Sequence, residues 1–137
     1  NPAEIWQGKI LSLSFIYNKK NEKLVFKPDF ANCKLKLDQI YFINLRLLKG
    51  IFNLPTALKV AKIDSVQNSI EFNYLKGGKS EGRQVLRFIK ESESRTRIVH
   101  TTYYRSNSKL RDKRFYPHFH ELAITELHKN LEKKALQ

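Results

Sequence analysis

The sequence predicts an α+β fold in which one long C-terminal helix grips a curved antiparallel sheet of about seven strands. Apolar residues alternate with a period of two through most of residues 5–105, and the period becomes helical only after Pro117. Strands and helices do not alternate along the chain, so a parallel sheet is not expected. We therefore expect a single domain over residues 1–137, strand-rich over 5–105, with its helix at about 116–134.

The beginning of the chain predicts an antiparallel meander. Residues 9–17 carry Leu11, Leu13 and Phe15 at alternate positions, which predicts a long strand with one apolar face. Shorter alternating runs predict two further strands, over residues 23–27 and 33–37.

Residues 38–54 are the exception to this pattern. Ile40, Ile43 and Leu47 lie three or four positions apart, which predicts a short helix that ends near Gly50. The same segment also alternates, so a strand is the competing interpretation.

The second half of the chain predicts four strands and the closing helix. The strands cover residues 58–64, 69–76, 81–90 and 95–105, and the short turns between them require antiparallel neighbours. The last segment has an apolar stripe at helical spacing, wide enough to pack across a sheet.

The composition indicates a strongly basic globular protein. Lys and Arg number 26 against 13 Asp and Glu, which gives a formal net charge of +13. Such a field attracts nucleic acid, anionic lipid headgroups or acidic proteins. The single cysteine, Cys33, excludes an internal disulfide, and no apolar run is long enough to cross a membrane. We therefore expect a cytoplasmic location and no transmembrane segment.

The four closing strands and the helix that follows them resemble the second half of the helix-grip superfamily. This group includes the START lipid-transfer domains and the polyketide cyclase-like proteins of SRPBCC type. The resemblance is carried by residues 69–76, 82–88 and 97–104 and by the helix after Pro117, about half of the chain. It implies a cavity between sheet and helix that binds or transports a hydrophobic or amphipathic small molecule, lipid- or polyketide-like.

Two other folds compete with this resemblance. Helix-grip proteins usually place two short helices after the first strand, where this chain has strand signals. A pleckstrin-homology-like barrel also has seven strands and a C-terminal helix. A lipocalin-like barrel is a weaker competitor, because Trp6-Gln7-Gly8 does not give the Gly-x-Trp order expected of a lipocalin.

The strand over residues 95–105 supplies the polar groups of the predicted pocket. His100, Thr102 and Tyr104 share one of its faces, and a few polar groups in an apolar space are typical of ligand pockets. Thr and Tyr are also simply good strand formers, which is the competing interpretation. Face parity predicts these lining residues: Phe72, Tyr74, Phe88, His100, Thr102, Tyr104, His120, Ile124 and Leu127.

Neither a catalytic centre nor a metal site is indicated. A cyclase- or hydrolase-like reaction at His100 and Tyr104 is conceivable, but no oriented base or carboxylate pair accompanies them. His120 and His128 share a helix face but lie about 12 Å apart along it, too far for one ion. We expect no metal and no cofactor.

A basic loop precedes the closing helix. Cations at a helix N-terminus oppose its dipole, so stability alone does not favour them. If the loop rims the cavity, it would attract an acidic ligand or an anionic membrane surface; alternatively, its charges could bond Glu121 and Glu126. The predicted rim consists of Arg105, Lys109, Arg111, Lys113 and Arg114.

Nucleic-acid binding is the rival function. Basic residues on the closing strands, near Tyr74, Phe88 and Tyr103, could form a charged sheet face with stacking aromatics. No zinc finger, helix-turn-helix or RNA-recognition motif accompanies them, so charge is the whole argument. The basic residues are Lys76, Lys79, Arg83, Arg87, Lys90, Arg95 and Arg97.

Overall fold

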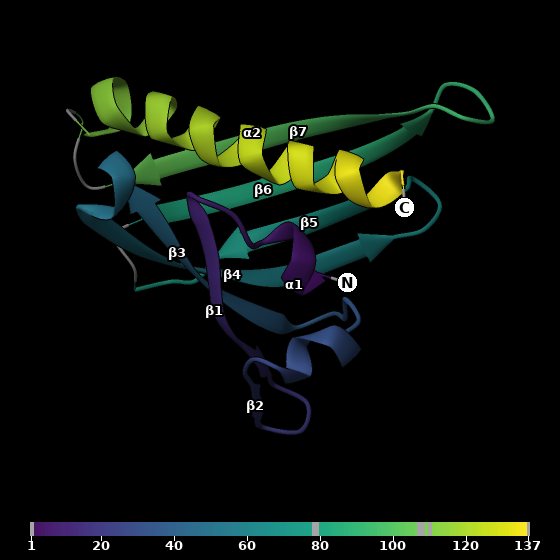
Figure 1. The fold of residues 1–137 in the computed structure, drawn as a ribbon, viewed down its shortest axis with the longest axis horizontal. Helices are drawn as coiled ribbons and strands as arrows, with labels where there is room; N and C mark the ends of the chain where they lie inside the picture. Colours follow the sequence, from purple (N-terminus) through teal and green to yellow (C-terminus); the bar gives the residue numbers. More distant parts are fainter. Residues whose placement is uncertain (1, 78–79, 107–108, 110, 137) are drawn as a thin grey trace.

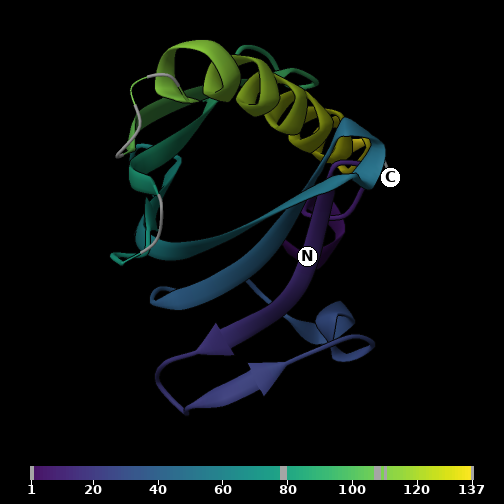
Figure 2. The same cartoon turned by 90° about the vertical axis from the view of Figure 1, so that its left-hand side faces the viewer.

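One curved, unclosed antiparallel sheet of seven strands forms the body of the structure, and a single long helix crosses its concave side (Figures 1 and 2). The computed structural model describes residues 2–77, 80–106, 109 and 111–136, without the side chains of residues 2, 3, 80, 111 and 112. Within this part of the chain, no helix is both long and apolar enough to span a membrane.

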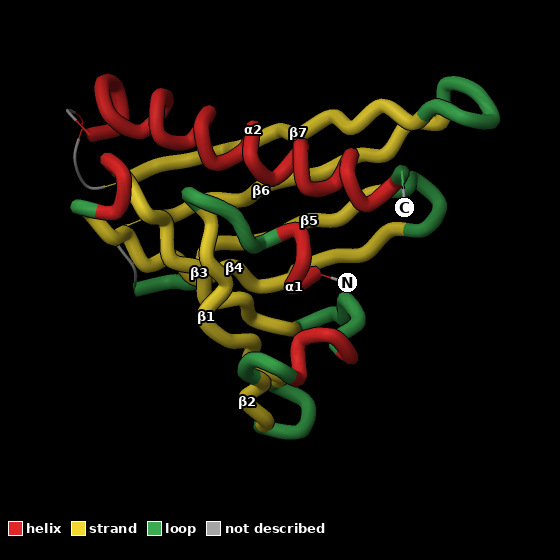
Figure 3. Tube along the Cα trace, in the orientation of Figure 1, coloured by secondary structure: helices red, strands yellow, loops and turns green. Residues whose placement is uncertain are grey.

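Strands dominate the chain up to the long helix, and only short helical turns interrupt them (Figure 3). The strands are β1 (Leu11–Asn18), β2 (Lys23–Val25), β3 (Gln39–Leu47), β4 (Phe52–Asp64), β5 (Ser69–Tyr74), β6 (Ser80–Lys90) and β7 (Thr96–Ser106). The helical elements are α1 (Pro2–Ile5), the 3-10 turns η1 (Asp29–Asn32) and η2 (Leu48–Gly50), the π-helical turn η3 (Arg111–Phe115) and α2 (Tyr116–Ala135).

The strand order is β2-β1-β3-β4-β5-β6-β7, and every neighbouring pair is antiparallel. This arrangement confirms the predicted α+β class with a helix-grip layout. The sheet ends at β2 and β7 without closing, which differs from the barrels of the two competing folds.

The predicted helix within residues 38–54 is wrong, because this segment forms β3 and the turn η2. Both faces of β3 are apolar. Tyr41 and Ile43 are buried in the core, whereas Phe42 stacks on Phe15 on the opposite face, with ring centroids 4.2 Å apart. A strand with two apolar faces inevitably contains apolar residues three and four positions apart, which imitates a helical pattern.

The predicted strand over residues 33–37 is also wrong. These residues follow η1 and have no partner strand among the described residues. Cys33 and Leu35 still pack against the core. The alternating pattern therefore arises because one face of this extended segment is buried, not because the segment pairs with a strand.

Two further details of the strands differ from the sequence pattern. A register shift between Leu13 and Phe15 turns β1, so that Ile16 joins the core in place of Phe15. β4 begins at Phe52 rather than at residue 58, because Pro55 lies in the portion of β4 that pairs only with β3.

The core lies between the concave face of the sheet and α2. Leu127 on the helix is 1% exposed, and Trp6 contacts Phe72 edge-on with ring centroids 6.1 Å apart. The buried cluster takes residues from every strand except β2 and β7, together with Trp6, Phe30 and the helix. Burial of these side chains holds the helix against the sheet.

Hydrogen bonds fasten the middle of α2 to the chain that leads into β1. The carboxylate of Glu126 accepts from the main-chain N–H groups of residues 9, 10 and 11 at 2.7, 2.9 and 2.7 Å. Asn130 Nδ2 donates to the carbonyls of Ile5 and Gln7 at 3.0 and 2.9 Å. Glu126 therefore binds main chain rather than the basic loop, contrary to the alternative drawn from the sequence.

Removing the Glu126 carboxylate should destabilise the fold. We expect Glu126→Ala to lower the free energy of unfolding by about 2–3 kcal/mol, because three main-chain donors lose a charged acceptor. Gly8→Ala should act in the same direction, since a Cβ at residue 8 would overlap the Glu126 carboxyl group. Urea unfolding followed by circular dichroism measures both effects.

The matched control is Glu121→Ala, which removes an exposed carboxylate from the same helix. An equal loss of stability in Glu121→Ala and Glu126→Ala would show that helix charge, not the hydrogen bonds to residues 9–11, is responsible.

Candidate functional site

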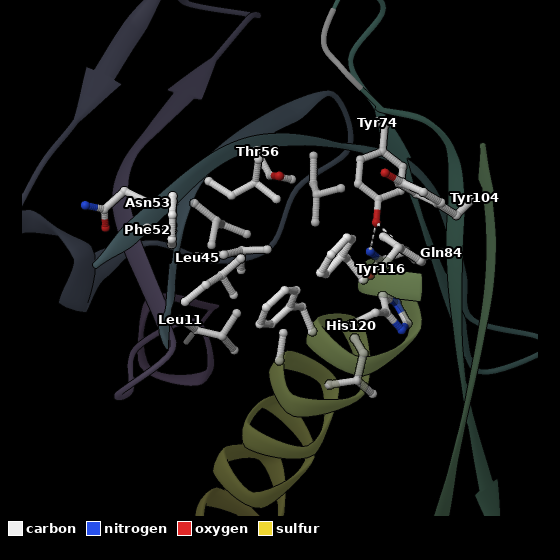
Figure 4. Close-up of a pocket in the computed structure, with 18 of the residues that line it drawn as sticks. Leu11, Leu45, Phe52, Asn53, Thr56, Tyr74, Gln84, Tyr104, Tyr116 and His120 are labelled. Carbon is white, nitrogen blue, oxygen red and sulfur yellow. Dashed lines mark hydrogen bonds between the residues drawn. The ribbon is translucent and has the colours of Figure 1, made fainter. Parts of the chain in front are cut away.

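A cavity of about 550 Å³ lies between the sheet and the first half of α2 (Figure 4). Its aliphatic wall comes from β1, β3 and β4 and includes Leu11, Ile43, Leu45 and Leu58. On α2, Ala123 faces the cavity with a side chain of one carbon, which leaves space beneath the helix.

Polar groups gather at the opposite side of this cavity, where β5, β6 and the start of α2 meet (Figure 4). Gln84 Nε2 donates to the Tyr74 hydroxyl at 2.6 Å, and the hydroxyls of Tyr74 and Tyr116 lie 3.4 Å apart. The rings of Tyr104 and Tyr116 stack with centroids 3.3 Å apart. The cavity is therefore amphipathic: a hydrogen-bonded group of neutral side chains lies on this side, and Asn53 and Thr56 of β4 are further polar residues in the lining.

Three imidazoles lie beside this polar wall, and one of them, that of His120, borders the cavity. The ring of His100 is 6.2 Å from that of His120 and 5.5 Å from that of His128, between centroids. Gln84 Oε1 accepts from His100 Nε2 at 3.2 Å, since the amide nitrogen of Gln84 is already directed to Tyr74. His120 Nε2 lies 3.0 Å from Thr102 Oγ1.

Burial favours the neutral form of these imidazoles. Burial, followed by the proximity of His128 and His120, lowers the pKa of His100 to about 4. Burial also lowers the pKa of His120 and that of His128. In the described part of the chain, no three His, Cys, Asp or Glu side chains are placed to hold a metal ion.

A second cavity, of about 780 Å³, lies under the second half of α2. Its apolar wall includes Phe72, Phe88, Leu127 and Leu131, and Lys134 contributes a charged side chain. Trp6 borders both cavities and therefore stands between them.

The structure divides the predicted lining residues between these two spaces. Tyr74, Tyr104, His120 and Ile124 border the first cavity, and Phe72, Phe88 and Leu127 border the second. His100 and Thr102 border neither, although their hydrogen bonds support Gln84 and His120.

Sequence reasoning missed Gln84 and the whole aliphatic wall from β1, β3 and β4. Gln84 has the same strand parity as Leu86 and Phe88, and a single amide on an apolar strand face was the available signal. The helical interpretation of residues 38–54 hides the part of this wall that β3 supplies, Ile43 and Leu45.

Part of the predicted basic rim lies next to the first cavity. Lys113 and Arg114 are exposed and directly precede Phe115, which borders that cavity, and Lys109 is also exposed. Arg105 is held by Glu81 at 2.9 Å, and the side chain of Arg111 lies outside the described residues.

The aromatic residues of the basic face proposed for nucleic acid lie on two faces of the sheet. Tyr74 and Phe88 border the cavities on the concave side, whereas Tyr103 is exposed on the other face, where Arg83 lies over its ring. Acidic partners engage four of the basic residues. The pairs are Arg83–Glu71, Lys90–Glu93, Arg95–Glu91 and Arg97–Glu91, and Lys79 lies outside the described residues.

No protein-family model, curated protein or solved structure matches this chain. The helix-grip layout thus rests on the structure alone, and the geometry of the cavities is the basis for inferring a function.

The buried imidazole of His100 should make the protein less stable in mild acid. Between pH 6.5 and about 4 the unfolded chain binds a proton at His100 that the native chain does not, so the free energy of unfolding falls as the pH drops through this window. We expect His100→Gln to make this pH dependence shallower. Denaturant titrations at several pH values measure it.

His118→Gln is the control, because His118 is exposed on the same helix as His120 and His128. A His100→Gln variant with the same pH dependence as the wild type would contradict the assignment.

Proposed function

We propose that this protein binds or transports a hydrophobic or amphipathic small molecule, lipid- or polyketide-like, in the first cavity. The observation that carries this proposal is an internal space of about 550 Å³ whose described wall contains no Lys, Arg, Asp or Glu. The size falls within the range of small-molecule sites, and the resemblance to helix-grip proteins agrees with it.

The wall chemistry favours a guest without charge on its buried part. An ionised group in this cavity would lose its hydration and meet no counter-ion, which is strongly unfavourable. Each Å² of apolar guest surface removed from water contributes roughly 25 cal/mol to the free energy of binding. An aliphatic or alicyclic body beside β1, β3 and β4 therefore suits the cavity.

The polar wall favours a hydroxyl or carbonyl at one end of the guest. The Tyr74, Gln84 and Tyr116 groups are neutral donors and acceptors at the cavity surface (Figure 4). They offer a guest partners for one polar group and hence a fixed orientation.

The proposal assigns no reaction to this site. His100 borders neither cavity and is bonded to Gln84, so the conceivable pairing with Tyr104 lacks a base that reaches the guest. Nucleic-acid binding is not proposed either, because ion pairs engage much of the charge on the strands and the aromatics are divided between two faces.

Filling the first cavity should abolish guest binding without unfolding the protein. We expect Thr56→Trp, which places an indole in the cavity wall, to remove binding of an uncharged naphthylamine fluorophore and of any copurified guest. Fluorescence titration and native mass spectrometry measure the two effects. Thr101→Trp, the same change at an exposed position of β7, should bind as the wild type does. Equal binding by both variants would refute the site.

The polar wall should distinguish guests by their polar end. We expect Tyr116→Phe to weaken binding of 1-dodecanol by about 2- to 10-fold, the effect of one neutral hydrogen bond, and to leave the apolar fluorophore unaffected. Displacement of the fluorophore by the alcohol measures this. Tyr103→Phe, on the opposite face, is the control. Equal loss for both guests would mean that Tyr116 acts through packing alone.

A further inference from the structure

Exposed apolar side chains surround the mouth of the first cavity. In and beside the turn between β3 and β4, Leu48, Ile51 and Phe52 are 54%, 78% and 61% exposed, and Phe115 before α2 is 48% exposed. Leu48, Phe52 and Phe115 also border the cavity. Such a cluster on a protein surface marks an interaction site.

The backbone of this turn is itself unusual. Leu48, Lys49 and Gly50 have φ values of 48°, 59° and 92°, so two consecutive residues with side chains adopt the left-handed conformation. This conformation costs free energy for any residue other than glycine. Strain of this kind is found where a local geometry serves a function.

The same end of the molecule carries uncompensated positive charge. The basic residues here lie in the β3–β4 turn, at the end of β5 and in the segment before α2. All are exposed, and none forms an ion pair within the described part of the chain: Lys49, Lys76, Lys109, Lys113 and Arg114.

Acidic side chains gather at the opposite end of the sheet. The antiparallel order puts the β4–β5 and β6–β7 turns there (Figure 1). Asp64 pairs with Lys62, and Glu93 pairs with Lys90, so these turns hold their charge in local pairs. The end at the cavity mouth therefore combines exposed apolar side chains with cations that have no ion pair among the described residues.

We propose that this end docks on an anionic lipid bilayer, with Leu48, Ile51 and Phe52 in the interface and the surrounding cations against the headgroups. A bilayer supplies both an apolar layer and negative charge, which is the combination this surface complements. Nucleic acid supplies charge and bases that stack on aromatic rings, but no apolar layer that would receive Leu48 and Ile51. The inference rests on the proposed function only where it concerns the guest. When this end is docked, the cavity mouth faces the membrane, and an amphipathic guest can pass between bilayer and cavity without entering water.

Sedimentation with lipid vesicles tests the docking surface. We expect the protein to bind vesicles of phosphatidylcholine with phosphatidylglycerol, and to bind vesicles of phosphatidylcholine alone much more weakly. Lys49→Glu combined with Ile51→Ser should lower the partition coefficient at least roughly tenfold, since one cation and one inserted side chain are lost.

The matched control combines Lys20→Glu with Val66→Ser. Lys20 is exposed in the β1–β2 turn, and Val66, 92% exposed, lies in the β4–β5 turn at the opposite end. Wild-type partitioning of this control supports the proposal. Equal losses in the two double variants, no binding of wild type to anionic vesicles, or oligonucleotide binding in its place would overturn it.

Binding of the uncharged fluorophore without vesicles separates this proposal from the proposed function. Vesicle binding that depends on Lys49 and Ile51, in a protein that does not take up the fluorophore, supports docking and refutes the cavity. Uptake of the fluorophore without vesicle binding refutes docking and leaves the cavity in place.

Discussion

The three hydrogen bonds to the Glu126 carboxylate are the constraint on which the rest of the structure depends. An unclosed sheet leaves its concave apolar face open, and α2 is the only described element long enough to cross it. At one side the helix follows β7 and stacks Tyr116 on Tyr104. At the other side Glu126 and Asn130 tie it to the segment that leads into β1. Together with the ion pair between Lys134 and Glu4, this second attachment fixes the helix to the N-terminal segment.

The position of this attachment explains why there are two spaces under the helix rather than one. Glu126 and Asn130 draw the chain around Trp6 beneath the middle of α2, where Trp6 meets Phe72 and borders both cavities. Tyr74, Gln84 and Tyr116 line the first cavity, under the start of α2, whereas Lys134 lines the second cavity. The hydrogen bonds of Glu126 and Asn130 thus place Trp6 between the first cavity, whose described wall has no charged residue, and the second cavity, whose wall has Lys134.

Much of this arrangement was predictable from local pattern, and its decisive contacts were not. The strands β5, β6 and β7 and the helix α2 follow from alternation, turn residues and the change of period, and the face that carries His100, Thr102 and Tyr104 does point toward the helix. The helical prediction for β3 fails because both of its faces carry apolar residues. Glu126 binds residues 115 to 117 positions away, and no local pattern identifies such a partner. The division by Trp6 likewise depends on tertiary contact alone.

The distribution of charge connects the cavity to the surface. The protein has a net charge of +13, and at the end away from the cavity ion pairs engage Lys62, Lys90, Arg95 and Arg97. At the mouth, Arg105 pairs with Glu81, but Lys49, Lys76, Lys109, Lys113 and Arg114 have no ion pair among the described residues, and apolar side chains are exposed beside them. If the cavity takes the apolar guest proposed above, that guest is poorly soluble in water and is concentrated in an apolar phase. The proposed guest and the proposed docking surface therefore call for the same environment, an apolar layer reached through a negatively charged one.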